Sequence, residues 1–170
     1  MRIALIAHDS RKELLAQFCT AYVRILSQNE LVATGVTGKV VHDACGLPVR
    51  CLYPGARGGA EQISSMIACG EIDMLLFFRD PVNARPNEPN AVTLLRLCDT
   101  RAIPVATNIA TAEVLIHGLE RGDLAWIELQ RGRNNEYPRN PSKHCRAIPH
   151  NSKCRYGERG AASAGAVLKP

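Results

Sequence analysis

The chain has 170 residues, of which 46% are apolar and 22% charged, so it is long enough for one sizeable core and has an ordinary globular composition. No apolar run approaches the ~20 residues that cross a bilayer, which argues against a membrane partner. The seven cysteines are odd in number and form no Cys-x-x-Cys pair, which argues against a disulfide framework. The first five lie in apolar stretches, where we expect buried thiols.

The net charge of +5 is unevenly distributed along the chain. Residues 1–130 contain 12 Lys and Arg against 14 Asp and Glu, a net charge of −2, whereas residues 131–170 contain 9 against 2, a net charge of +7. We therefore predict one folded domain, residues 1–130, and a basic tail, residues 131–170, that is disordered because it lacks apolar periodicity. Nucleic-acid binding is not expected, except weakly through this tail.

The two ends of the chain suggest further expectations. In the tail, two histidines and two cysteines raise the alternative of a zinc site: His144, Cys145, His150 and Cys154. Their spacing fits no common zinc finger, so we favour a loose tail and predict no metal. The first nine residues become charged too soon for a secretory signal, and we interpret them as a strand of a cytoplasmic protein.

Five apolar, β-prone runs alternate with helical patterns in the folded part: Ile3–Ala7, Leu31–Thr34, Val49–Tyr53, Met74–Phe78 and Ile103–Ala106. The run Met74–Phe78 is continuous rather than alternating, which is typical of a strand buried on both faces. Five strands separated by helices predict an α/β domain with a mainly parallel sheet and helices on both of its faces.

The helical segments carry recognisable ends. Ser10–Glu13 has the form of a capping box, followed by apolar residues at helical spacing up to Leu26. A shorter apolar stripe ends at Gly46, and the helix after the third strand ends at Gly70, a typical C-terminal glycine cap. Pro89 suits the first turn of the fourth helix, and Ala112–Leu119 supplies the fifth.

Polar residues follow every strand, at the edge where parallel sheets bind ligands. After the third strand, Gly55–Gln62 leads into a helix, and glycines there allow close backbone approach to an anion such as phosphate. A tight turn without a ligand is the alternative. Lys12 can bind a phosphate as a point charge. The hydroxyls of Thr34 and Thr37 can hydrogen-bond the phosphate oxygens. The alternatives to phosphate binding are that Lys12 is an ordinary solvated lysine and that Thr37 caps a helix.

His8 and Asp80 end neighbouring strand runs, and a histidine beside a carboxylate suits proton transfer. The alternative for Asp80 is a turn-forming aspartate.

Several short motifs stand in a specific order and spacing: Ile3–Asp9 with Lys12, Ala33–Gly35 with Thr37-Gly38, Gly55 with Gly58-Gly59 and Gln62, Phe77–Pro81, Leu94–Asp99, and Pro104 with Ala106–Asn108. Together they resemble the methylglyoxal synthases over residues 1 to about 128. That family converts dihydroxyacetone phosphate to methylglyoxal and phosphate without a metal or organic cofactor. Its members share a Rossmann-like α/β domain and usually assemble as hexamers.

The resemblance implies a lyase that acts on dihydroxyacetone phosphate, needs no cofactor and forms a homohexamer. It places Asp80 in the active site. It also implies that a set of loop residues holds the substrate, chiefly its phosphate: His8, Lys12, Thr34, Gly35, Val36, Thr37, Gly55 and Asn87.

The sequence departs from the family pattern where proton transfer is concerned. The family's general base, an aspartate directly after Gly58-Gly59, is Ala60 here. Alanine takes no proton, and loss of a general base typically lowers the rate by ~10²–10⁴. Four other family residues are replaced, namely a histidine by Asn87, an aspartate by Asn90, a threonine by Val36 and a serine by Pro54.

Glu61 and Asp80 are the candidate replacement bases, with His8 or Asn87 hydrogen-bonded to the substrate carbonyl. One step along a helix turns a side chain by about 100°. Glu61 would therefore point away from the position of Ala60, unless the helix begins after it. The sequence leaves this point open.

Two functions remain as interpretations. The first is a methylglyoxal-synthase-like lyase with rearranged acid and base groups, favoured by a match over the whole domain. The second is a non-catalytic module that binds a phosphorylated ligand, as in the effector domain of carbamoyl-phosphate synthetase, favoured by the missing base. We expect the enzyme.

Overall fold

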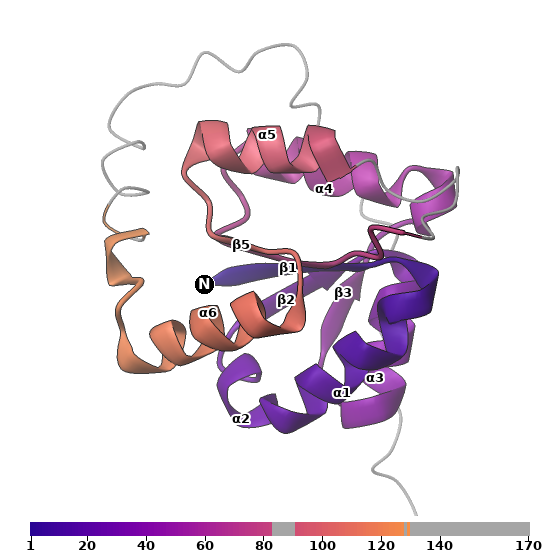
Figure 1. The fold of residues 1–170 in the computed structure, drawn as a ribbon, viewed down its shortest axis with the longest axis horizontal. Coiled ribbons are helices and arrows are strands. Elements are labelled where there is room, and N and C mark those ends of the chain that lie inside the picture. Colours follow the sequence, from indigo (N-terminus) through magenta and orange to yellow (C-terminus); the bar gives the residue numbers. More distant parts are fainter. Residues whose placement is uncertain (83–90, 128, 130–170) are drawn as a thin grey trace, which may run out of the picture.

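The computed structural model describes residues 1–82, 91–127 and 129. A five-stranded sheet in the order β3-β2-β1-β4-β5 runs through the centre of the domain, and all its pairings are parallel (Figure 1). The strands are β1 (Arg2–Ala7), β2 (Glu30–Ala33), β3 (Val49–Cys51), β4 (Met74–Phe78) and β5 (Val105–Ala106). The predicted α/β class and parallel five-stranded sheet are confirmed.

Helices cover both faces of the sheet (Figure 1). One face carries α1 (Lys12–Ala21), α2 (Val23–Leu26), α3 (Gly35–Cys45) and α6 (Ile109–Arg121). The other face carries α4 (Gly59–Ala68) and α5 (Ala91–Arg101). Two short 3₁₀ turns, η1 (Asp9–Arg11) and η2 (Gly55–Arg57), stand just before α1 and α4. The chain therefore forms three layers.

The core has two halves because successive strand residues point to opposite faces of the sheet. Leu5 and Leu76 belong to the half that faces α1, α3 and α6, while Ile6 and Leu75 belong to the half that faces α4 and α5. All five residues of Met74–Phe78 are buried, as their continuous apolar run predicts.

The glycine caps are confirmed, but the capping box is not. Gly46 and Gly70 have φ near +69°, the left-handed conformation typical of a residue that follows a helix. In contrast, α1 begins only at Lys12, and its N-cap residue Arg11 makes no side-chain cap. The Ser10 hydroxyl donates elsewhere, as described below. Pro89 lies outside the described residues.

The described cysteines follow the expectation only in part. Cys19 and Cys98 are buried free thiols, and burial raises the pKa of each to about 12. Cys45 and Cys51 are free but only half-buried. Cys69 is disulfide-bonded, so a buried thiol was wrongly expected there. This residue follows the last turn of α4 and remains partly accessible.

Within the described residues, none of the helices combines the length and the apolar character needed to span a bilayer. No group of three or more His, Cys, Asp or Glu side chains in this part of the chain is arranged to hold a metal ion. The basic tail and the four residues of the zinc alternative lie outside the described residues.

Candidate active site

The direction of strand order reverses between β1 and β4. From β1, the strands β2 and β3 extend to one side of the sheet and β4 and β5 to the other. In open α/β sheets, the crevice at the carboxyl ends of the strands where this reversal occurs is the usual ligand site. Ala7 pairs with Phe78 at this point, so His8 and Asp80 follow neighbouring strand ends.

His8 and Asp80 are in direct contact. The backbone N–H of His8 donates to the carbonyl oxygen of Phe78 at 3.0 Å, which fixes the loop after β1 to the end of β4. The backbone N–H of Asp80 donates to Nδ1 of His8, also at 3.0 Å. Because Nδ1 accepts this bond, the neutral ring carries its proton on Nε2. The buried ring also meets Phe77 edge-on, with centroids 5.2 Å apart.

The carboxylate of Asp80 is held at both oxygens. Oδ2 accepts a hydrogen bond from the Ser10 hydroxyl at 2.8 Å, and Oδ1 accepts one from the backbone N–H of Val82 at 3.0 Å. Donors on both oxygens fix the orientation of the side chain, so Asp80 is a buried carboxylate with defined geometry. It is suited to accept a proton from a group in the crevice.

Besides α1, the helices α3 and α4 also begin at this edge without a side-chain cap. Thr34 is the N-cap residue of α3, but its hydroxyl donates to the hydroxyl of Thr37 at 3.0 Å rather than accepting a helix N–H. Gly58, the N-cap residue of α4, has no side chain to offer. At the start of α6, by contrast, the Asn108 side chain accepts the N–H of Thr111. Uncapped N-termini retain N–H groups for an anion.

The loops before α3 and α4 are packed against each other. The carbonyl oxygen of Tyr53 accepts the N–H of Gly35 at 3.1 Å, while the N–H of Tyr53 donates to Oε1 of Gln62 at 2.8 Å. Gly59 donates its N–H to the carbonyl oxygen of Pro54 at 3.1 Å. The strand-to-helix turn that begins at Gly55 is thus fixed by three hydrogen bonds.

The remaining predicted residues occupy different positions at this edge. Lys12, half-buried at the start of α1, forms an ion pair with Asp9. Val36 is exposed in the first turn of α3. Gly55 begins η2. Asn87 lies outside the described residues.

The start of α4 at Gly59 bears on the choice between the two candidate bases. Ala60 and Glu61 are both helical, so their side chains point in different directions. Ala60 is only 6% exposed, whereas Glu61 is exposed, and its Oε2 lies 3.9 Å from the point where a Cβ on Gly58 would stand. Glu61 is therefore near its own helix N-terminus, where the helix dipole favours a carboxylate.

The sequence did not predict the contacts of two residues at this edge. Ser10 was assigned to a helix cap but bonds Asp80, and Gln62 was noted only as part of a motif but holds the backbone of Tyr53. Their partners are 70 and 9 residues away in the chain. The position of Ser10 just after a strand was the available signal.

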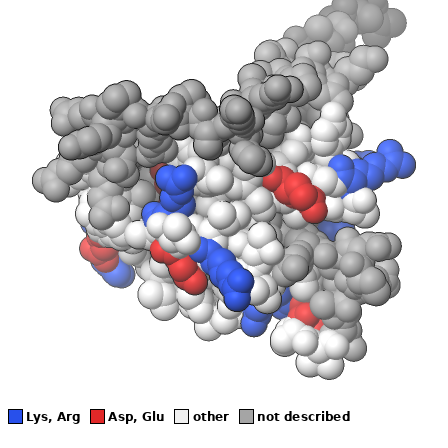
Figure 2. Space-filling view, turned by 90° about the horizontal axis from the view of Figure 1, so that it is seen from above, with Lys and Arg blue, Asp and Glu red and all other residues white. Residues whose placement is uncertain are grey.

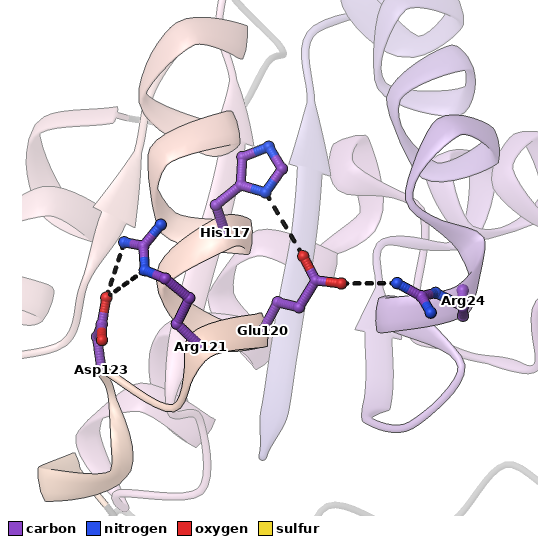
Figure 3. Close-up of polar contacts among 5 residues, drawn as sticks. All are labelled: Arg24, His117, Glu120, Arg121 and Asp123. Atoms are coloured by element: carbon purple, nitrogen blue, oxygen red, sulfur yellow. Dashed lines mark hydrogen bonds and ion pairs between the residues drawn. The ribbon is translucent and has the colours of Figure 1, made fainter.

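A separate cavity of about 420 Å³ lies at the opposite, amino-terminal edge of the sheet, lined by residues that include Met1, Asn29 and Gly122. Figure 3 shows two of its residues, Glu120 of α6 and Arg24 of α2, joined by an ion pair of 2.8 Å. His117 Nδ1 stands 3.6 Å from the other oxygen of Glu120. The cavity shares no residue with the His8–Asp80 edge.

The charges on the domain surface are mixed. The side that carries α4 and α5, seen from above in Figure 2, shows Lys and Arg interspersed with Asp and Glu. This view shows no broad basic surface among the described residues, which agrees with the net charge of −2 for residues 1–130.

A family model described as the MGS-like domain matches residues 15–107. The methylglyoxal synthase of Caldicellulosiruptor saccharolyticus is 57% identical over 129 residues, which cover 76% of this chain and 92% of that protein. The methylglyoxal synthase of Geobacillus sp. (strain WCH70) is 53% identical, over 80% of this chain and 97% of that protein. This chain belongs to the methylglyoxal synthase family.

A solved structure supports the same assignment for the fold. The crystal structure of methylglyoxal synthase from Elizabethkingia anophelis NUHP1 superposes with a TM-score of 0.66 at 36% sequence identity, over 68% of this chain and 76% of that chain. The predicted Rossmann-like, methylglyoxal-synthase-like fold is thereby confirmed. Members of the methylglyoxal synthase family are lyases, so the enzyme class expected from the sequence is also supported.

Proposed function

We propose that this chain is a lyase that converts dihydroxyacetone phosphate to methylglyoxal and phosphate, with Asp80 as the base. The observation that carries the proposal is the buried, doubly hydrogen-bonded carboxylate of Asp80, whose backbone N–H donates to the His8 ring at the strand-order reversal. Relatives named methylglyoxal synthase, more than half identical to this chain, support the substrate class. The hexameric assembly implied by the resemblance and the cytoplasmic location inferred from the first nine residues remain predictions.

The proposed phosphate site uses Lys12, Thr34, Gly35, Thr37 and Gly55. The ammonium group of Lys12 offers a positive charge that is balanced in the free protein by Asp9. The start of α3 offers backbone N–H groups that no side chain caps. A phosphate bound there would gain hydrogen bonds and a favourable helix dipole. Val36 adds its backbone N–H but no hydroxyl.

The proposed reaction has three chemical steps. Asp80 takes a proton from the hydroxymethyl carbon beside the substrate carbonyl, and the electron pair moves to oxygen to give an enediolate. The Nε2–H of His8 stabilises the developing negative charge by a hydrogen bond. The enediolate then expels phosphate as the bond between carbon and the phosphate oxygen breaks, its hydroxyl proton passes to the departing phosphate, and the resulting enolate takes up a proton on carbon to give methylglyoxal. Lys12 and the start of α3 stabilise the departing phosphate.

Glu61 is the weaker candidate for the base. Its side chain is exposed to water on a different side of α4 from Ala60 and lies near Gly58. A buried carboxylate with fixed orientation loses less conformational freedom and less solvation on reaching the transition state than a mobile, solvated one does. Asn87, the other group proposed at the substrate carbonyl, keeps that place in the proposal as a neutral hydrogen-bond donor.

The second candidate function is a regulatory module that binds a phosphorylated ligand without turning it over. It is favoured by one observation, the buried methyl group of Ala60 at the family's base position. The two functions share the phosphate site and differ only in turnover. An assay for methylglyoxal and phosphate release from dihydroxyacetone phosphate therefore separates them.

Lys12→Ala is expected to weaken binding of dihydroxyacetone phosphate by about tenfold or more, because a charge-assisted contact to phosphate is lost. The ligand-induced rise in melting temperature, which reports binding to the native state alone, should fall accordingly. Lys39→Ala is the matched control, since Lys39 is an exposed lysine further along α3. An equal loss in both variants, or no binding by the unmodified protein at millimolar ligand, would contradict the phosphate site.

Ala60→Asp is expected to raise turnover by up to ~10²-fold, the low end for a general base, because it restores the family's carboxylate. Ala60→Asn is the control, since it has nearly the same shape but takes no proton. Both variants place a polar group in a site that is only 6% exposed, so both should lower the melting temperature. An equal effect of the two variants on turnover would show that the carboxylate at this position is not used.

A further inference from the structure

The Ser10 hydroxyl has a partner that the local sequence does not suggest. Ser10 and Glu13 stand at capping-box spacing, and a hydroxyl at that position normally accepts a helix N–H. Here the chain instead forms the 3₁₀ turn η1, α1 begins at Lys12 without a side-chain cap, and the hydroxyl donates to Asp80 at 2.8 Å. The start of α1 thus forgoes a stabilising cap while a contact to Asp80 is made.

The geometry around Asp80 shows what this contact fixes. The backbone N–H of Asp80 is bonded to His8, which sets the position of its main chain. The N–H of Val82 binds Oδ1, and the Ser10 hydroxyl binds Oδ2. Donors on opposite oxygens oppose rotation of the carboxylate about its Cβ–Cγ bond. Of these two donors to the carboxylate, only Ser10 acts through a side chain, which can be exchanged without altering the backbone.

We propose that Ser10 is a positioning residue that holds the Asp80 carboxylate in one orientation through a hydrogen bond to Oδ2. The inference deepens the proposed function, because it rests on Asp80 as the base. Ser10 does not touch the substrate, and it acts only through the Asp80 carboxylate. It bridges the loop after β1 to the loop after β4, and so aligns the carboxylate with the His8 ring that meets the substrate oxygen.

Ser10→Ala is expected to lower kcat by about tenfold and to leave KM within about twofold, because an oriented base acts in the transition state. The acid limb of the pH–rate profile should move up by roughly one pH unit, since one hydrogen bond to the charged form is lost. Ser10→Thr keeps a hydroxyl and should restore both values. Ser27→Ala is the matched control, because Ser27 is an exposed serine whose hydroxyl bonds a backbone carbonyl at 3.0 Å.

The same variants should be compared by a ¹³C NMR titration of the Asp80 carboxyl, assigned through Asp80→Asn. This readout needs no turnover, so it tests Ser10 even if the unmodified protein proves inactive. The titratable groups on the two loops that Ser10 and Asp80 belong to are left unchanged in every variant, namely His8, Asp9, Arg11, Lys12 and Arg79.

The proposal would be overturned if the Asp80 carboxyl titrated at the same pH in Ser10→Ala as in the unmodified protein. A loss of kcat in Ser10→Ala that Ser10→Thr fails to restore would also overturn it. A shift of the Asp80 titration to higher pH in Ser10→Ala, with no such shift in Ser27→Ala, supports the proposal. If Ser10→Ala does not fold, Ser10→Cys takes its place, because a thiol of similar size is only a weak donor.

Discussion

Asp80→Asn is expected to lower turnover of dihydroxyacetone phosphate by ~10²–10⁴, the usual range for removal of a general base. The amide keeps the shape of the side chain and can still accept the N–H of Val82, but it takes no proton from carbon. Affinity for the phosphorylated ligand should change little, because phosphate contacts act in the ground state as well as in the transition state. Steady-state phosphate release and ligand-induced thermal shifts measure the two quantities separately.

Glu61→Gln is the matched control, since it makes the same chemical change at an exposed carboxylate on α4. It should leave turnover nearly unchanged. The reverse outcome, an inactive Glu61→Gln beside an active Asp80→Asn, would show that Glu61 is the base. A protein that binds the ligand but releases no methylglyoxal or phosphate above the uncatalysed rate would leave the regulatory module as the better account.

The layers of the fold were predictable because their signals are local. The apolar run Met74–Phe78 is continuous, and the strand it forms is buried on both faces. Gly46 and Gly70 stand where the apolar stripes stop, and both adopt the positive φ that glycine tolerates best. Such features depend on a few neighbouring residues, so the sequence alone contains them.

The order of the strands was not predictable in the same way. The alternation of strands and helices fits several orders, whereas the site depends on β1 being next to both β2 and β4. That neighbourhood brings Thr34, His8 and Asp80 to consecutive strand ends. The sequence located these residues at strand ends, and long-range pairing determined which ends are adjacent.

Ser10 shows most clearly why the site could not be read completely from the sequence. Its capping box with Glu13 is a good local signal, yet the hydroxyl bonds Asp80, 70 residues away. A cap would use the hydroxyl oxygen as an acceptor, whereas the Asp80 contact uses its proton, so the local and the tertiary partner compete for the orientation of one side chain. The distance between Ser10 and Asp80 in the folded chain decides this competition, and the sequence does not contain that distance.

The choice between Glu61 and Asp80 was likewise left open by the sequence. It depended on whether α4 begins before or after Glu61, and helix starts shift easily by a residue or two. Gly58, with φ of +92°, forms the N-cap, and the helix begins at Gly59. A glycine pair offers two possible starts, and only the packing against Tyr53 and Pro54 selects between them.

Gly59→Ala is expected to destabilise the fold by about 3 kcal/mol and to remove most of the phosphate-ligand thermal shift. A Cβ at this position would overlap the carbonyl oxygen of Tyr53 and stand 2.9 Å from its carbonyl carbon and 3.1 Å from that of Pro54. These are backbone atoms, so no side-chain rotation relieves the overlap. Chemical denaturation and ligand titration by thermal shift measure the two effects.

Gly118→Ala is the matched control, because Gly118 is a buried helical glycine whose added Cβ would meet only Asp123, at 3.9 Å. That change should stabilise the protein by roughly 0.5–1 kcal/mol, as alanine loses less backbone entropy in a helix than glycine does. The loss of ligand response in Gly59→Ala has a specific cause. The Tyr53 carbonyl that must move also accepts the N–H of Gly35, so its displacement disturbs the starts of both α3 and α4. A Gly59→Ala protein that keeps its full ligand response would show that the phosphate is bound without these two helix N-termini.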